Sequence, residues 1–384
     1  MRPLLPLGVL TVAAVVAACT PPLPPDVLAA NAERQIECQA ADAAVTAPGR
    51  LADAVAQFNT SLQGLCPEQS MTATAPGEPA AVTLIDHPPT AAEVADAAAA
   101  CPSGSSLLVA PTFGVGIAVA FNIIGIDTLT LTPAVIAGIL QGSITSWDDP
   151  AIAALNDGID LTGLPITLVR PADASGAVQA ISQWLSQTAP EAWSQGTVDV
   201  LPAGEPMASG QELVDALFAA DGAVTVMSIA EASRNVFGMA SIPIPIPDTS
   251  EEVLMPPSNA DLVKIGIAAA QVTTDEQGHM FASHALGGVP VAGQFDQSAA
   301  KIVLQPGQPT IGWPVIEMVH VLACDDPADP LPRLTAQFMN KLAGQGVLEG
   351  VGFTPLPEPV RVLTFPALNV TVPTDAPVVP EPTS

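Results

Sequence analysis

Basic residues are scarce in this chain, and tyrosine is absent. Among 384 residues there are 10 lysines and arginines against 38 aspartates and glutamates, which gives a formal net charge of −28. Nucleic acid and anionic lipid surfaces would be repelled by this charge, so neither is expected as a partner. A site for a small anion must rely on local hydrogen bonds. We attribute the lack of tyrosine to genomic composition bias and draw no functional conclusion from it.

Motifs of catalysis and metal binding are also missing. The chain has no Gly-x-Ser-x-Gly sequence, which marks the nucleophile of α/β-hydrolases, and Ser175 has no recognisable base beside it. It has no Cys-x-x-Cys pair, so a structural zinc site is not expected. The sequence therefore predicts a protein that is not an enzyme and that carries no metal or other cofactor.

A long apolar run that could act in targeting occurs at the start of the chain. After Met1 and Arg2, residues 4–18 are almost wholly apolar, and Val16-Ala17-Ala18-Cys19 matches the lipobox of bacterial lipoproteins. The run has the length of a signal-peptide core and is too short to span a membrane. We expect cleavage before Cys19, acylation of its sulfur, and an exported protein anchored to the outer face of the cytoplasmic membrane. The alternative is an ordinary secretory signal that contains a cysteine.

Four cysteines remain after such a cleavage. An even number in an exported chain favours two disulfides, for which three pairings are possible. We favour Cys66 with Cys101, which leaves Cys38 with Cys324; four buried free thiols are the alternative.

Strand-like and helix-like segments alternate through the rest of the chain, which is 49% hydrophobic and long enough for two lobes with cores. This alternation is typical of an α/β fold with helices on both faces of a sheet. The proline-rich residues 20–30 predict an extended tether, and residues 363–384 predict a tail with little packing. Short apolar runs predict strands at 44–46, 71–74, 81–85, 107–110 and 117–121, and composition predicts a helix at 91–100.

The most informative stretch covers residues 139–176. It predicts a helix, a loop containing Trp147, a buried strand at 166–169, and a turn of small residues, Asp173-Ala174-Ser175-Gly176, that opens another helix. Such a turn directs several backbone N–H groups and one hydroxyl at a single spot, where the helix dipole favours an anion. We expect Trp147 to pack between a helix and the sheet.

This stretch resembles the phosphate-binding proteins of bacterial phosphate ABC transporters, in which it reads approximately Gly-x-Ile-Thr-x-Trp-x-Asp-Pro and then Arg-x-Asp-Gly-Ser-Gly-Thr. The similarity extends over about 44–362 and is poor in 250–310. It implies a two-lobed type II periplasmic-binding-protein fold with a ligand cleft between the lobes and a double-crossed hinge. The implied organisation is a signal peptide at 1–18, a tether at 19–39, lobe one at 40–114 plus 254–362, lobe two at 115–253, and a tail at 363–384.

The resemblance also implies ligand-binding residues, several of which are altered. Ser175 and the amides of Gly176 and Ala177 match the oxyanion-binding turn of the family, although Ala177 replaces its threonine and Pro171 replaces its arginine. Asp86 matches the carboxylate that accepts a proton from bound phosphate. The alternative for Asp86 is an exposed acid that caps a turn.

Two arginines are candidates to replace the lost positive charge. Arg50, with Gly49, lies in the place of a ligand-binding loop of the family, although a solvated surface position is the simpler expectation for this arginine. Arg170 precedes Pro171 on a strand, so its side chain should point to the opposite face. Asp173 is expected to stabilise the turn or cap the helix.

Two functions stay open from the sequence. The first is a solute-binding lipoprotein that serves an ABC permease and binds phosphate or another small oxyanion. The second is a relative that kept the two-lobed fold but acts as an envelope sensor or protein-interaction module, which the loss of the arginine and the threonine favours.

Overall fold

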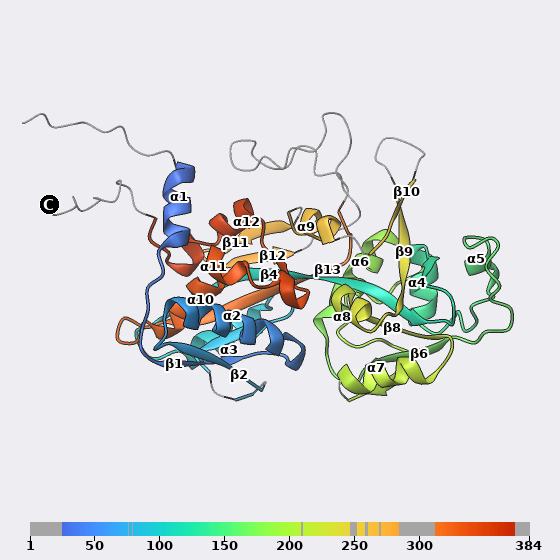
Figure 1. Cartoon of the computed structure of the whole chain (residues 1–384), viewed down its shortest axis with the longest axis horizontal. Helices are drawn as coiled ribbons and strands as arrows, with labels where there is room; N and C mark the ends of the chain where they lie inside the picture. Colours follow the sequence, from blue (N-terminus) through green and yellow to red (C-terminus); the bar gives the residue numbers. More distant parts are fainter. Residues whose placement is uncertain are drawn as a thin grey trace, which may run out of the picture.

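The computed structural model describes residues 25–75, 77–78, 80–208, 210–245, 252–257, 260–268, 270–283 and 312–372. Two lobes lie side by side, and a long strand, β4 (Ser106–Asn122), runs through both of them (Figure 1). Helices cover the strands in each lobe, which confirms the predicted two-lobed α/β fold. The predicted signal peptide and Cys19 lie outside the described residues.

The main sheet is continuous across the two lobes. In lobe one, β1 pairs in parallel with β2 and β3, whereas β13 is antiparallel to both β3 and β4. In lobe two, β4 pairs with β8, and β8 pairs in parallel with β6. The strand order is β2 (Ser70–Thr74), β1 (Asp42–Thr46), β3 (Val82–Ile85), β13 (Ile316–Asp325), β4, β8 (Ala223–Ser228), β6 (Thr167–Pro171) and β7 (Glu205–Met207).

Strand β4 connects the lobes because its two ends have different partners. Residues 106–116 pair with β13, and residues 117–122 pair with β8. The sequence predicted two short strands here, but Pro111 does not end the strand, because the register of β13 shifts beside it, between Val319 and His320. At the change of partner, Ile117 donates to the carbonyl of Val315 over 2.9 Å, and the Trp313 indole donates to the carbonyl of Ile117 over 2.8 Å.

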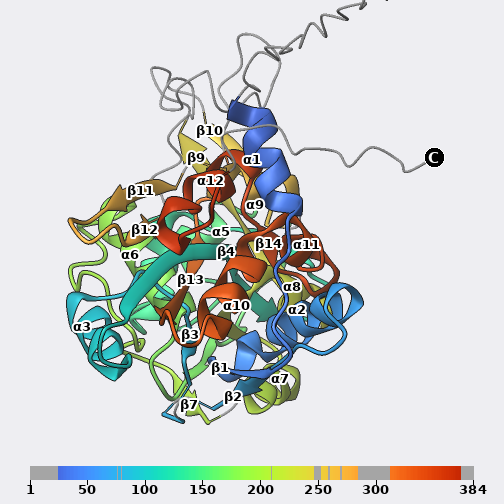
Figure 2. The same cartoon turned by 90° about the vertical axis from the view of Figure 1, so that its left-hand side faces the viewer.

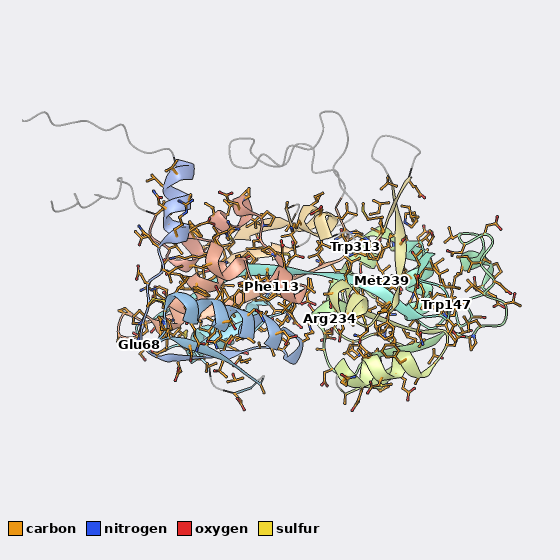
Figure 3. All side chains as sticks on the ribbon, in the orientation of Figure 1. Glu68, Phe113, Trp147, Arg234, Met239 and Trp313 are labelled. Atoms are coloured by element: carbon orange, nitrogen blue, oxygen red, sulfur yellow. A yellow bond between two sulfur atoms is a disulfide. The ribbon has the colours of Figure 1, made fainter. Side chains whose placement is uncertain are left out.

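Lobe one packs helices on both faces of its strands. Helices α2 and α10 lie beside these strands (Figure 2). The core includes Phe58 from α2 and Phe113 from β4, whose ring centroids lie 6.1 Å apart, and the two rings are fully buried. Phe113 is labelled in Figure 3. The other elements here are η1 (Gly49–Leu51), α2 (Ala52–Leu65), α3 (Ala91–Ala100), α9 (Ala260–Ala268), β11 (Gln271–Thr274), β12 (Met280–Ser283), α10 (Leu331–Asn340), α11 (Leu342–Gln345), η2 (Glu349–Val351), β14 (Thr354–Pro355), α12 (Glu358–Leu363) and η3 (Pro366–Leu368).

Lobe two has its own core around Trp147. This side chain is fully buried, packs 5.6 Å from the ring of Phe121, and donates its indole N–H to the carbonyl of Gly222 over 2.9 Å. The predicted packing position of Trp147 is thus confirmed (Figure 3). The other elements of this lobe are β5 (Thr128–Thr130), α4 (Pro133–Leu140), α5 (Pro150–Ala153), α6 (Gly176–Thr188), α7 (Gly210–Ala219), α8 (Ile229–Arg234), β9 (Gly238–Pro245) and β10 (Glu252–Met255).

Both terminal segments are more ordered than the sequence predicted. Residues 25–34 form helix α1 instead of an extended tether, and Ala32 is buried against lobe one. In the expected tail, Phe365 and Leu368 are fully buried and belong to the core. Apolar side chains at these positions supply burial that the surrounding proline content concealed. Residues 373–384 of the predicted tail lie outside the described residues.

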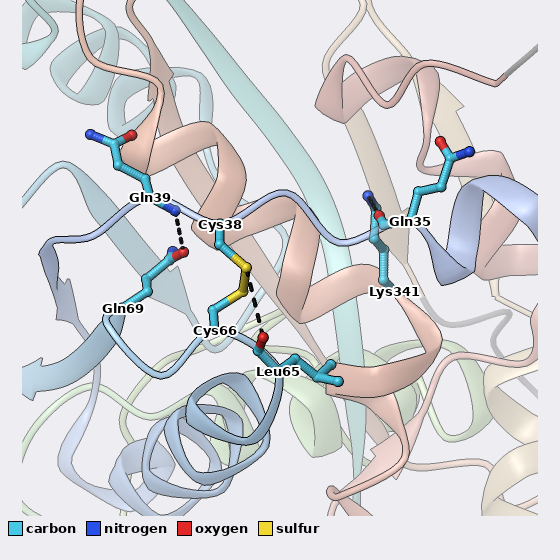
Figure 4. Close-up of a disulfide and its surroundings, with 7 residues drawn as sticks. All are labelled: Gln35, Cys38, Gln39, Leu65, Cys66, Gln69 and Lys341. Carbon is cyan, nitrogen blue, oxygen red and sulfur yellow. Dashed lines mark hydrogen bonds between the residues drawn. A yellow bond between two sulfur atoms is a disulfide. The ribbon is translucent and has the colours of Figure 1, made fainter. Parts of the chain in front are cut away.

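Two disulfides are present, as predicted, but the favoured pairing is wrong. Cys38 pairs with Cys66 beside the end of α2 (Figure 4), and Cys101 pairs with Cys324 between the end of α3 and the end of β13. The Cα atoms of each pair lie 5.5 Å apart. The pairing follows from strand order, because β13 joins the sheet next to β3 and β4 and so brings Cys324 to Cys101. In the part of the chain that the structure describes, no helix combines the length and apolar character needed to cross a bilayer.

Candidate functional site

A pocket of about 180 Å³ lies where the two lobes meet. Its walls come from the loop after β3 and the start of β13 in lobe one, and from α6 in lobe two. The parallel strands β1 and β3 both end at this edge of the sheet. In α/β folds, the loops at the carboxyl ends of strands often carry the polar residues that bind a ligand. The lining residues are Asp86, His87, Pro88, Gly176, Gln179, Ala180, Gln183, Thr197, Ile316, Glu317 and Met318.

Arg50 lies beside this pocket and is bound by two carboxylates. Its Nη1 donates to both oxygens of Glu317, over 2.6 and 2.7 Å, and its Nη2 forms an ion pair with Asp86. Burial alone would lower the pKa of Arg50, but the charges of Glu317 and Asp86 raise it above its ordinary value. The expectation of a solvated surface arginine is therefore wrong, although 33% of the side chain stays exposed.

Asp86 reaches across the boundary between the lobes. Its Oδ2 binds Arg50 and also accepts a hydrogen bond of 3.2 Å from the backbone N–H of Gly176, the first residue of α6. Burial raises the pKa of Asp86, but the hydrogen bond from His87 and the charge of Arg50 outweigh it, so the pKa lies well below its usual range. The alternative of an exposed capping acid does not hold, because Asp86 is buried.

His87 connects the pocket to helix α3. Its Nδ1 lies 3.0 Å from Asp86, and its Nε2 lies 3.0 Å from Glu93. Glu93 also closes the capping box of α3 with Thr90. Burial lowers the pKa of His87, but the two carboxylates raise it overall.

Glu317 was not predicted from the sequence. It lies near the start of β13, is buried, and has no exposed side-chain surface. Burial raises its pKa to about 7, although Arg50 opposes this rise. The available signal was an acid near the head of a mostly apolar strand, since a charge in such a run requires a buried partner.

The start of α6 has the geometry of a small anion site. Gly176 is needed there, because a Cβ at this position would collide with the backbone carbonyl of Asp86. Ser175 is buried, caps the helix by position without a side-chain bond to it, and donates its N–H to the carbonyl of Asp199 over 3.0 Å. Ala177 is buried in the first turn. The predicted strand, turn and helix are thus present at β6 and α6.

The remaining candidates lie away from this cluster. The Arg170 guanidinium donates to the carbonyl of Pro171 over 3.0 Å, and neither residue lines the pocket. Asp173 is exposed, and Ser175 instead of Asp173 occupies the N-cap position of α6. Gly49 opens η1 beside Arg50 and is itself exposed. Trp313 is buried in the core beside β4 and does not line the pocket.

Around the pocket, two basic side chains, Arg50 and His87, face three acidic ones, Asp86, Glu317 and Glu93. Within the described residues, no group of three or more histidine, cysteine, aspartate or glutamate side chains has an arrangement that could hold a metal ion. The arrangement therefore supports hydrogen bonding and charge pairing with a small polar solute.

Comparison with known proteins agrees with this architecture. The phosphate-binding protein PstS2 of Mycobacterium bovis is 27% identical over 339 residues, which cover 83% of this chain and 84% of the relative. The phosphate-binding protein PstS 3 of Mycobacterium leprae is 25% identical over 335 residues, covering 83% and 84%. A solved high-affinity periplasmic phosphate-binding protein, PfluDING, shares the fold, with a TM-score of 0.58 at 20% identity over 85% of this chain and 93% of that structure. A sequence profile of the PBP superfamily domain matches residues 56–340, and the chain therefore belongs to the PBP superfamily.

Proposed function

We propose that this protein is an extracytoplasmic solute-binding protein that holds a small oxyanion, with phosphate as the first candidate, between its lobes at the start of α6. One observation carries the proposal: the backbone N–H of Gly176 donates a hydrogen bond to an anionic oxygen, Oδ2 of Asp86 from the opposite lobe. Helix N-termini favour such oxygens because their first N–H groups have no partner within the helix.

The proposal gives a role to each residue near the pocket. The hydroxyl of Ser175 and the amides of Gly176 and Ala177 donate to the oxyanion. Arg50 supplies the positive charge that Pro171 cannot supply. Asp86 accepts a hydrogen bond from the O–H group of a protonated oxyanion, which distinguishes phosphate from a fully ionised anion of similar shape.

The relatives support phosphate as the ligand. Two curated mycobacterial proteins that match most of the chain are named phosphate-binding proteins. By the same comparison, an ABC permease is the proposed partner, and binding instead of catalysis is the proposed activity. Acylation of Cys19 would keep the protein at the outer face of the cytoplasmic membrane. We propose the boundaries that the sequence predicts, lobe one at 40–114 plus 254–362 and lobe two at 115–253, with three extensions. Helix α1 and residues 363–372 are added to lobe one, and β10, which pairs with β9, extends lobe two to residue 255.

A calorimetric titration with inorganic phosphate tests this function. We expect saturable binding and a rise in melting temperature, since a ligand at 100 times its Kd adds about 2.7 kcal/mol to the stability. Arg50→Met should weaken binding at least tenfold, whereas Arg170→Met, at the other sequence candidate, should leave the Kd unchanged. Absence of heat and of thermal shift with phosphate, sulfate, molybdate and phosphonates would refute the proposal.

A further inference from the structure

Arg50 is shared between two acids, and one of them is completely enclosed. We propose that Glu317 couples oxyanion binding to the uptake of one proton, so that the anion enters beside a neutral carboxylic acid. This inference rests on the proposed function, because it concerns the same pocket. The inference goes beyond the proposed function because it assigns a role in anion binding to Glu317, which no sequence motif indicated.

The geometry places Glu317 at the point where an added negative charge is least tolerated. Both of its oxygens contact Nη1 of Arg50, and the side chain has no exposed surface. Glu317 also lines the pocket, close to Asp86. When both acids are ionised, Arg50 already faces two negative charges, and a bound oxyanion would be a third in a poorly hydrated space.

Protonation of Glu317 removes this conflict. A neutral carboxyl keeps one O–H donor, which can be directed at the oxyanion, whereas a carboxylate offers only acceptors. Burial raises the pKa of Glu317 to about 7. An anion bound nearby disfavours the ionised form and raises this pKa further.

Few other titratable groups face Glu317. From the elements packed against β13, the loop after β3 contributes Asp86 and His87, with Glu93 behind His87, and η1 contributes Arg50. Strands β3, β4 and β12 and helix α6 contain no titratable side chain. Among the remaining neighbours, Arg333 of α10 pairs with Asp325, Lys264 of α9 pairs with Glu349, and Asp261 lies on α9. On β13 itself, His320 is hydrogen-bonded to the carbonyl of Met318 and the N–H of Ala282. Glu231 of α8 lies near enough to Arg50 for their charges to interact.

The proposal predicts a defined pH dependence. Near pH 8, Glu317 is ionised in the free protein and protonated in the complex, so binding takes up close to one proton. Near pH 5.5, it is protonated in both states, and uptake through this residue vanishes. Above pH 7, the affinity of the wild type should therefore fall by an additional factor of about ten per pH unit, compared with a variant that lacks this acid.

Calorimetry in buffers of different ionisation enthalpy counts the protons. Phosphate itself titrates in this range, so the readout is the difference between the wild type and Glu317→Gln. We expect a difference close to one proton at pH 8 and close to zero at pH 5.5. Glu349→Gln, which removes an acid from a surface pair with Lys264, should behave like the wild type.

The outcomes of this experiment distinguish failure of the proton coupling from failure of the proposed binding function. Phosphate binding with equal proton uptake in the wild type and Glu317→Gln overturns the coupling and leaves the binding function intact. Absence of phosphate binding by the wild type at every pH overturns both. If Glu317→Gln fails to fold, infrared difference spectroscopy of the wild type at pH 8 gives the same answer. Addition of phosphate should produce the C=O band of a protonated carboxylic acid, and absence of that band refutes the coupling.

Discussion

Glycine at position 176 permits a close approach between α6 of lobe two and the loop after β3 of lobe one. A methyl group there would meet the backbone carbonyl of Asp86, which cannot move aside as a flexible side chain could. We predict that Gly176→Ala separates the loop after β3 from α6 and weakens phosphate binding at least tenfold in calorimetry.

The matched control for this change is Gly64→Ala. Gly64 lies in helix α2, and a Cβ there meets no atom within 4 Å. Alanine in an exposed helical position stabilises a protein by about 0.5–1 kcal/mol relative to glycine, so this variant should bind normally and melt slightly higher. Equal affinities of the two variants would contradict the close approach at Gly176.

The buried acid Glu317 also makes stability depend on pH. Its pKa is raised from 4.5 to about 7 on folding, so the folded state holds a proton that the unfolded state has lost between these values. The neutral form of Glu317 therefore adds at most about 3 kcal/mol to the free energy of unfolding. This contribution is complete below pH 4.5 and is lost as the pH rises to 7. Glu317→Gln should remove this decline, as measured by urea unfolding at pH 5 and pH 8.

Other groups titrate in the same experiment but in separable ways. Asp86 has a lowered pKa, so its contribution is present above pH 4 and is lost toward lower pH; His87 has a raised pKa, so its contribution is lost above pH 6.5. Both effects are common to the wild type and the variant. An unchanged difference between the two proteins at pH 5 and pH 8 would show that Glu317 keeps an ordinary pKa.

At the residue scale, local motifs predicted more than long-range pairs. Asp86 and Gly176 were found because each matches a short family pattern, and both line the pocket. The ion pairs of Arg50 were not foreseen, because its partner Glu317 lies 267 residues away and only the sheet order brings them together. For the same reason the sequence alone predicts a solvated position for Arg50.

At the scale of elements, the disulfide between Cys101 and Cys324 joins the end of α3 to the end of β13 across 223 residues. Loop-closure entropy predicts that its removal destabilises the protein by about 2 kcal/mol more than removal of the bond between Cys38 and Cys66, which spans 28 residues. We expect Cys101→Ser with Cys324→Ser to show the larger fall in urea midpoint than the other double serine variant. Equal falls would contradict this ranking, and peptide mapping without reduction checks the pairing.

Helix α1 is attached to lobe one by a buried ion pair. Glu33 accepts a hydrogen bond of 2.5 Å from Arg361 of α12, and both residues are buried. Glu33→Ala leaves an uncompensated charge and should cost about 3 kcal/mol of unfolding free energy, whereas Glu349→Ala, in an exposed pair with Lys264, should cost less than about 1 kcal/mol. If chemical denaturation shows that Glu33→Ala and Glu349→Ala lower the unfolding free energy by the same small amount, α1 does not pack on lobe one.

The elements near the termini were harder to predict than those of the sheet. Alternating apolar runs gave β1, β2, β3 and β6 at nearly the observed places, because strand burial leaves a local pattern. Proline-rich segments at both ends concealed α1 and η3, whose burial depends on surfaces formed by distant residues. The disulfide pairing required the position of β13, which no local pattern reveals.

At the scale of the whole molecule, the two lobes share β4 and meet at the pocket. The hydrogen bond between Asp86 and Gly176 crosses the boundary, as does an exposed pair between Asp53 of α2 and Arg234 of α8 at 3.8 Å. Figure 3 shows Arg234 on the side of lobe two that faces lobe one. Closure of lobes over a solute removes water from it and strengthens each hydrogen bond. The account therefore requires the anion to compete with Asp86 for the start of α6.

The most direct test of this central claim is a crystal structure of the protein with arsenate, a phosphate analogue whose arsenic atom is located by anomalous scattering. The account predicts one strong peak between the lobes, with arsenate oxygens within hydrogen-bond distance of the Gly176 amide and the Arg50 guanidinium. An arsenate site elsewhere, or an empty pocket at saturating arsenate with Asp86 still bonded to Gly176, would contradict it.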